Sequence, residues 1–208
     1  MISMVSIWAS ATTSEFALSD PATSSRPRRA QSKLRPPWLF GALKILALAA
    51  LLLPPSLRAD VLLAPEAFIA EQFPEQTPAP KALWLTGKLG EQVSAILGHP
   101  PASLRARYWA QGSRSAWILE EIGKELPITV GISVQDGALH QVRVLIYRES
   151  RGWEVRLPSF TEQFEQLQLD QDLQLNGNID GISGATLSVR ALSKLARLAL
   201  LLDSQRPQ

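Results

Sequence analysis

The sequence predicts an α+β fold, an antiparallel sheet with helices packed on one side, preceded by an N-terminal signal or anchor helix. Apolar residues alternate with polar ones through much of residues 104–148, which is the period of strands. Apolar residues recur at helical spacing in residues 88–97 and 186–202. The chain has 208 residues, 46% of them hydrophobic, which is enough for one domain with a leader.

The N-terminal 59 residues have the order of features expected of an export signal. Residues 1–37 are basic and rich in Ser, Thr, Ala and Pro, which predicts a disordered basic leader. Residues 38–59 contain an apolar run followed by Pro54 and Pro55, which predicts a signal-peptide h-region or a membrane anchor. A cleavage site is possible after Ala59, and both a cleaved signal and a retained anchor remain open. Either would export the rest of the chain to the periplasm or to the outer face of the cytoplasmic membrane.

The composition excludes several classes of site. The chain has no cysteine, which excludes disulfides, thiolate-bound zinc, iron–sulfur clusters and covalently attached haem. Its two histidines, His99 and His140, are far apart in the sequence, so no metal site is predicted. The net charge of the whole chain is +2, but residues 60–208 hold 14 Lys and Arg against 17 Asp and Glu. The exported part is therefore mildly acidic, and no nucleic-acid partner is expected.

Residues 60–100 are predicted to form a helical N-terminal segment and a linker. An apolar patch from Val61 to Phe73 predicts a short helix, and the Pro-rich stretch that follows predicts a linker. Residues 88–97 place their apolar side chains on one helix face, and Gly98 with the residues after it should end this helix.

Residues 101–208 are predicted to form the functional domain, which begins with an antiparallel meander. Asp136-Gly137 is a strong hairpin signal between two of its strands. In the last strand, Val142, Val144 and Ile146 alternate with Arg143, Leu145 and Tyr147, so each set should occupy one face. The predicted strands are Leu104–Gln111, Ser115–Glu121, Pro127–Gln135 and Leu139–Tyr147.

Two helices are expected after the meander. Residues 159–169 should form the first, with Ser159 as its N-cap and Glu162 completing a capping box. Residues 186–202 should form the second, which has a narrow polar stripe and must therefore pack against the sheet.

The segment Asp180 to Ser188, DGISGATLS, runs directly into this last helix. Its glycines and small residues let a ligand approach the backbone, and the first amides of the helix are free donors at a positive dipole end. Such a site suits a phosphate, to which Thr186 and Ser188 would add hydroxyls. An ordinary glycine-rich loop that caps a helix is the alternative. A nucleophile elbow is disfavoured because no histidine follows His140.

DGISGATLS resembles the D-G-x-S/T-G-A-T-x-S/T signature of the FMN-binding domain family. This family includes the covalently flavinylated C subunit of the Na⁺-translocating NADH:quinone oxidoreductase and the G subunit of the Rnf complex. The resemblance implies that Thr186 carries FMN through a phosphoester, attached outside the cytoplasm by a flavin transferase. It also implies cofactor-binding or recognition roles for Asp180, Gly181, Ser183, Gly184, Ala185 and Ser188.

A second resemblance lies upstream of this motif. Residues 147–152 resemble the family's H-x-E-T-x-G element near the flavin ring, which implies that Glu149 and Ser150 lie close to FMN. Phe160, Gln163 and Phe164 resemble an aromatic segment that follows this element.

Three further residues are candidate flavin contacts on chemical grounds. Arg148 and Arg151 could stabilise anionic reduced flavin, and Trp153 could stack on its face. Solvated arginines and a surface-packed tryptophan are the alternative. Strand alternation places Glu149 and Arg148 on opposite sides, so without a bulge only one of them can face the flavin.

The sequence predicts an electron-transfer flavoprotein with FMN as cofactor, more an electron carrier than a stand-alone enzyme. No proton-relay histidine or substrate-specific base is evident, so no catalytic residue is predicted. The expected partners are a flavin transferase for maturation and membrane redox proteins. Noncovalent binding of FMN or another phosphate ligand, an assembly role without redox turnover, and a flavin-dependent reductase remain open.

Overall fold

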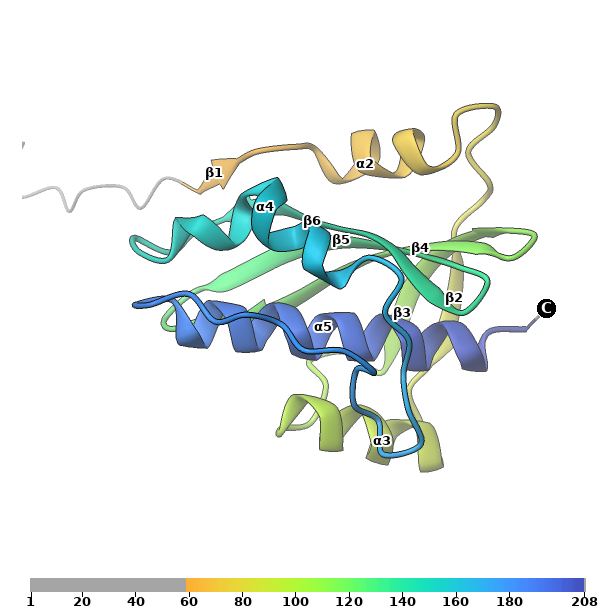
Figure 1. Cartoon of the computed structure of the whole chain (residues 1–208). Coiled ribbons are helices and arrows are strands. Elements are labelled where there is room, and N and C mark those ends of the chain that lie inside the picture. Colours follow the sequence, from red (N-terminus) through yellow and green to blue (C-terminus); the bar gives the residue numbers. More distant parts are fainter. Residues whose placement is uncertain (1–58, 208) are drawn as a thin grey trace, which may run out of the picture. The chain divides into compact units, whose positions relative to one another are not determined.

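The computed structural model describes residues 59–207, which lie in one compact unit of the chain (Figure 1). The predictions for the leader, residues 1–37 and 38–59, fall on residues outside this range apart from Ala59. Within residues 59–207, no helix combines the length and the apolar character needed to cross a membrane.

A six-stranded sheet forms the centre of this unit. All its pairings are antiparallel, in the order β1-β6-β5-β4-β3-β2. The four strands predicted from alternation are present, and Asp136 and Gly137 both have positive φ, as a tight hairpin turn requires. The strands are β1 (Asp60–Val61), β2 (Lys81–Trp84), β3 (Arg105–Gln111), β4 (Arg114–Ile122), β5 (Pro127–Gln135) and β6 (Ala138–Tyr147).

Helices cover both faces of the sheet, which corrects the prediction that they pack on one side. The helices α3 (Gly87–Leu97) and α5 (Thr186–Gln205) pack on one face of the sheet, and their side chains form the main hydrophobic core together with the side chains of that face. The helix α2 (Pro65–Gln72) lies on the opposite face, where Phe68 and Ile69 pack on Ala116 and Leu145 (Figure 1). The sequence missed this because a short helix with few apolar residues does not reveal which face it will cover.

A β-bulge in β6 overturns the strict alternation predicted for that strand. Thr129 pairs with Ile146 while Val130 pairs with Val144, so Leu145 is an extra residue without a partner on β5. Tyr147 consequently lies in the main core with Val144, and Leu145 turns to the α2 side. The bulge matters for function because Tyr147 begins the segment that leads to the candidate site.

The helix predicted over residues 159–169 is largely absent. A four-residue helix, α4 (Pro158–Thr161), passes into the 3₁₀ helix η2 (Glu162–Phe164), and Gln166 then has a positive φ of 65°. Ser159 is not the cap, because the helix starts at Pro158. The chain leaves the helix to bond with the start of β6, where the Gln166 N–H donates to the Leu139 carbonyl. The 3₁₀ helix η1 (Trp153–Arg156) precedes α4.

A buried carboxylate ties α3, β4 and α5 together. Glu121, whose side chain is only 6% exposed, accepts from Lys194 Nζ at 3.1 Å and contacts His99 Nε2 at 3.1 Å. Lys194 also donates to the Leu97 carbonyl at the end of α3. The polar stripe of α5 is thus directed partly inward, where it satisfies carbonyls and a carboxylate.

We expect this cluster to make stability depend on pH. The Pro100 carbonyl and the Glu121 carboxylate raise the pKa of His99, so the protonated form favours folding. The contribution is complete below about pH 6.5 and is lost as pH rises through the raised pKa. Because His99 is 47% exposed, the effect should stay below about 1 kcal/mol. Urea unfolding at pH 5.5 and 8.5 measures how much the free energy of unfolding differs between the two pH values. This difference should be smaller in His99→Gln than in wild type, and an equal difference in both proteins would contradict the assignment.

Candidate functional site

A cavity of about 480 Å³ opens where α5 begins. Its walls come from the first turn of α5, the turn that joins β4 to β5, and the segment that follows β6. This volume lies within the usual range of small-molecule sites. The lining residues are Lys124, Glu125, Glu149, Ser150, Arg151, Gly184, Ala185, Thr186, Leu187 and Ser188.

The start of α5 presents backbone donors and a hydroxyl to this cavity. Gly184 adopts a positive φ of 83°, and Ala185 then stands at the cap position without any side-chain cap. The first N–H groups of a helix have no intrahelical acceptor and lie at the positive end of its dipole. Thr186, at the first helical position, is exposed, whereas Ser188 is buried at 4% exposure. The helix start can therefore hold an anion, with one accessible hydroxyl beside it.

Gly152 allows the segment after β6 to approach this helix start. Its φ is 78°, and a Cβ at this position would lie 3.1 Å from Ala185 Cβ and 3.2 Å from Ser188 Oγ. The Tyr147 hydroxyl donates to the Arg151 carbonyl at 2.5 Å, which fixes the same segment from within. Burial is the main cause that raises the pKa of Tyr147, so its hydroxyl remains a donor. These contacts bring Ser150 and Arg151 to the cavity.

Glu149 anchors the turn between β4 and β5. Its Oε1 accepts from the N–H groups of Lys124, Glu125 and Leu126 at 2.5, 2.7 and 3.0 Å. Burial by itself raises the pKa of Glu149, but these three donors together with the Lys124 charge lower it overall. Glu149 therefore stays ionised and holds Lys124 at the cavity, opposite Arg151 on the β6 side.

Seven of the predicted site residues line this one cavity. They come from two segments more than thirty residues apart in the sequence, which the packing of α5 beside β6 brings together. They are Glu149, Ser150, Arg151, Gly184, Ala185, Thr186 and Ser188.

The other five predicted residues do not line it. Arg148 points to the opposite side, as strand alternation predicts, and its guanidinium donates to Pro127 and Thr129. Trp153 is 48% exposed, with the Arg156 guanidinium 5.6 Å from its ring centre. The remaining three, Asp180, Gly181 and Ser183, are exposed in the loop before the cavity.

Sequence reasoning missed the contribution of the β4–β5 turn and of one glutamine. Lys124, Glu125 and Leu187 line the cavity, but no local pattern connects the turn to a helix sixty residues later. Gln163 Oε1 accepts from the Asp180 N–H at 2.8 Å and so holds the start of the DGISGATLS loop. Gln163 lies in the segment with Phe160 and Phe164 that resembles the family. This resemblance is the one feature of the sequence that could have indicated a role for Gln163.

The comparison with known families agrees with this geometry. Residues 123–201 match the FMN-binding domain family, and no significant match was found among curated proteins. The matched region starts immediately before Lys124 and contains every residue that lines the cavity. Free helix amides, a lysine and an arginine form the donor set that a flavin phosphate requires. By this comparison residues 123–201 form an FMN-binding domain, and the cofactor that the match indicates is FMN.

Proposed function

We propose that this chain is an exported electron-transfer flavoprotein whose FMN is attached covalently, through a phosphoester, to Thr186. The observation that carries this proposal is the exposed hydroxyl of Thr186 at the first position of α5, within the cavity of the matched domain. The phosphate of the attached FMN would meet the free amides of the helix start there.

Accessibility distinguishes the two hydroxyls of the helix start. A transferase must reach the acceptor oxygen, and Thr186 is exposed while Ser188 lies against Gly152 at 4% exposure. Lys124 and Arg151 line the same cavity and would neutralise the phosphate charge. This arrangement supports attachment at Thr186, with Ser188 as a packing residue beneath it.

The residues around the cavity favour electron transfer over turnover of a separate substrate. Bound FMN supplies one- and two-electron redox chemistry. The lining side chains include two carboxylates, those of Glu125 and Glu149. Three backbone N–H groups donate to Glu149 Oε1, so this carboxylate is poorly suited to act as a base. The chain's own residues would bind and orient the cofactor, and electrons would pass to and from partner proteins.

Maturation and location form part of the same proposal. The order of basic leader, apolar run and proline break supports export of the domain, by a cleaved signal or a retained anchor within residues 38–59. A flavin transferase would then act outside the cytoplasm, and a membrane redox protein would be the electron partner.

Co-expression with a flavin transferase in an exporting host tests the proposal. The full chain should give a fluorescent band after denaturing electrophoresis. The intact mass should rise by FMN less one water, and the same spectrum should report the mature N-terminus. Flavin that is lost on dialysis against denaturant would instead indicate noncovalent binding, and the covalent proposal would be withdrawn.

Gln163 offers a test of how the loop is positioned. Gln163→Leu removes the acceptor for the Asp180 N–H, so the loop before Thr186 should loosen and flavin loading should fall several-fold. Loss of this one bond should cost about 1 kcal/mol of stability. Gln163→Glu keeps an acceptor oxygen and should load nearly as well as wild type. The ratio of flavin absorbance to protein absorbance measures loading, and equal ratios in all three proteins would refute this role.

A further inference from the structure

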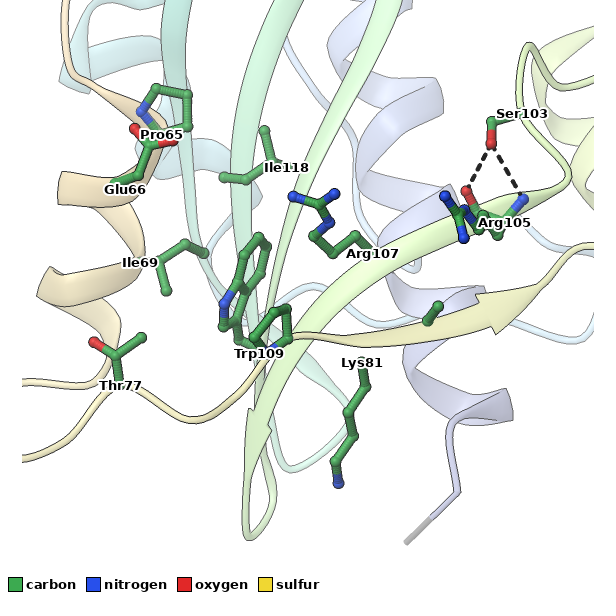
Figure 2. Close-up of a pocket in the computed structure, with 12 residues that line it drawn as sticks. Pro65, Glu66, Ile69, Thr77, Lys81, Ser103, Arg105, Arg107, Trp109 and Ile118 are labelled. Atoms are coloured by element: carbon green, nitrogen blue, oxygen red, sulfur yellow. Dashed lines mark hydrogen bonds between the residues drawn. The ribbon is translucent and has the colours of Figure 1, made fainter.

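A second and larger cavity, of about 870 Å³, lies on the α2 face of the sheet (Figure 2). We call it the β3 groove. None of its lining residues falls within residues 123–201, so FMN binding does not account for it. The lining residues are Pro65, Glu66, Ile69, Thr77, Pro80, Lys81, Ala82, Ser103, Arg105, Arg107, Trp109 and Ile118.

The β3 groove forms where β3 separates from β4. The pairing of β3 with β4 covers residues 108–111, whereas its pairing with β2 covers residues 105–108. Arg105, Arg107 and Trp109 alternate onto the same face of β3. The helix α2 packs on β4 and β5, and its residues Pro65, Glu66 and Ile69 form one wall of the groove.

Unpaired positive charge lines the groove. Arg105 and Arg107 share the groove with a single acidic lining residue, Glu66, and within residues 59–207 neither arginine forms an ion pair. Lys81 borders the groove, but it pairs with Tyr108 of the main core, so its side chain leaves the sheet on the other face. Elsewhere in the described part, four arginines do pair with carboxylates: Arg143, Arg148, Arg156 and Arg206. Because residues 60–208 carry a net charge of −3, this positive strip is a local feature of an acidic domain. An anionic occupant would relieve the repulsion between its neighbouring cations.

Apolar side chains accompany the cations. Ile69, Trp109 and Ile118 are partly or fully buried and form the apolar part of the lining. Trp84, at the end of β2, pairs across the strands with Arg105 and is 61% exposed, which extends the apolar surface beyond the groove. Exposed tryptophan and arginine side chains are typical of protein interfaces.

The cations are spread along the groove. In Figure 2 the side chains of Lys81 and Arg107 extend in different directions, and Arg105 lies farther along β3. Arg105 and Arg107 are successive side chains on one face of β3, so the positive charge runs along the strand. An extended chain with several carboxylates could pair with them one by one, and carboxylates match the planar guanidinium in two-point hydrogen bonds.

We propose that the β3 groove docks an extended acidic segment of a partner protein, with apolar side chains between its carboxylates. The carboxylates would pair with Arg105 and Arg107, and the apolar side chains would cover Trp109 and Ile118. Docking here would hold the partner on a surface outside the FMN-binding region and leave the flavin cavity open.

A labelled peptide tests the groove directly. The probe is a fluorescein-labelled peptide of alternating Asp, Glu and Leu, titrated by anisotropy with the full chain in neutral detergent. Its Kd should rise at least tenfold in Arg105→Gln/Arg107→Gln, about 1.4 kcal/mol, and should weaken with added salt. The matched control Arg190→Gln changes an exposed arginine on α5 that forms no ion pair within the described residues, and it should bind as wild type does. All variants should keep wild-type flavin loading.

Three results would overturn the proposal. The first is that the acidic peptide fails to bind, or binds no better than its Asn, Gln and Leu counterpart. The second is equal binding by wild type and the double variant. The third is that short-chain phosphatidylglycerol, below its micelle concentration, binds through the two arginines while the peptide does not, which would assign the groove to a membrane surface.

Discussion

Thr186→Ala is expected to reduce covalent flavin to background while leaving the fold intact. The Thr186 side chain is exposed and makes no side-chain hydrogen bond within the described residues, so its removal should change stability by about 0.5 kcal/mol or less. Thr186→Ser keeps a hydroxyl at the same place and should restore at least part of the adduct. In-gel fluorescence after denaturing electrophoresis measures the adduct, and circular dichroism confirms the fold.

Two matched controls make this result specific. Thr77→Ala removes another exposed threonine hydroxyl, outside the FMN-binding region, and should leave loading unchanged. Ser188→Ala removes the buried hydroxyl of the same helix start and should keep the adduct. An adduct that persists in Thr186→Ala would show that FMN is attached elsewhere. Noncovalent flavin that remains with Thr186→Ala in native buffer would be consistent with the cavity retaining its amides, Lys124 and Arg151.

The parts of the fold that sequence patterns predict correctly are those with strong local signals. The Asp136-Gly137 turn, the existence of the strands β3 to β6 and the long amphipathic helix α5 need no knowledge of distant residues. The short strands β1 and β2 were not predicted, because two and four residues define a strand only through the partner with which they pair. The bulge at Leu145 was missed for the same reason, since register belongs to a pair of strands.

The same distinction between local signals and long-range contacts applies to the residues of the candidate site. Gly184, Ala185, Thr186 and Ser188 could be predicted because a local motif at a helix start has a local physical meaning. The contribution of Lys124 could not, because it depends on the hydrogen bonds by which Glu149 holds a distant turn. Glu149 itself was predicted as a flavin neighbour, and the structure adds that its Oε1 binds backbone amides of that turn.

Glu149→Ala should therefore produce the largest loss of stability among these variants. It removes the acceptor for three backbone N–H groups, and hydrogen bonds to a charged group contribute about 1.5–3 kcal/mol each at most. Water can reach the exposed turn and replace part of this, so we expect a net loss of about 3 kcal/mol. Flavin loading should also fall, because Lys124 would no longer be held at the cavity.

The pH dependence separates this anchoring role from simple packing. The pKa of Glu149 is lowered in the folded chain, so its contribution is present above the ordinary carboxyl value of about 4.3 and is lost as pH falls through the lowered value. Glu149→Gln keeps an acceptor oxygen without the charge, so it should lose less than the alanine variant at pH 7 and approach wild type near pH 3. Urea unfolding at both pH values measures this convergence. A stability gap between Glu149→Gln and wild type that stays constant from pH 7 to pH 3 would mean that the carboxylate charge does not hold the turn.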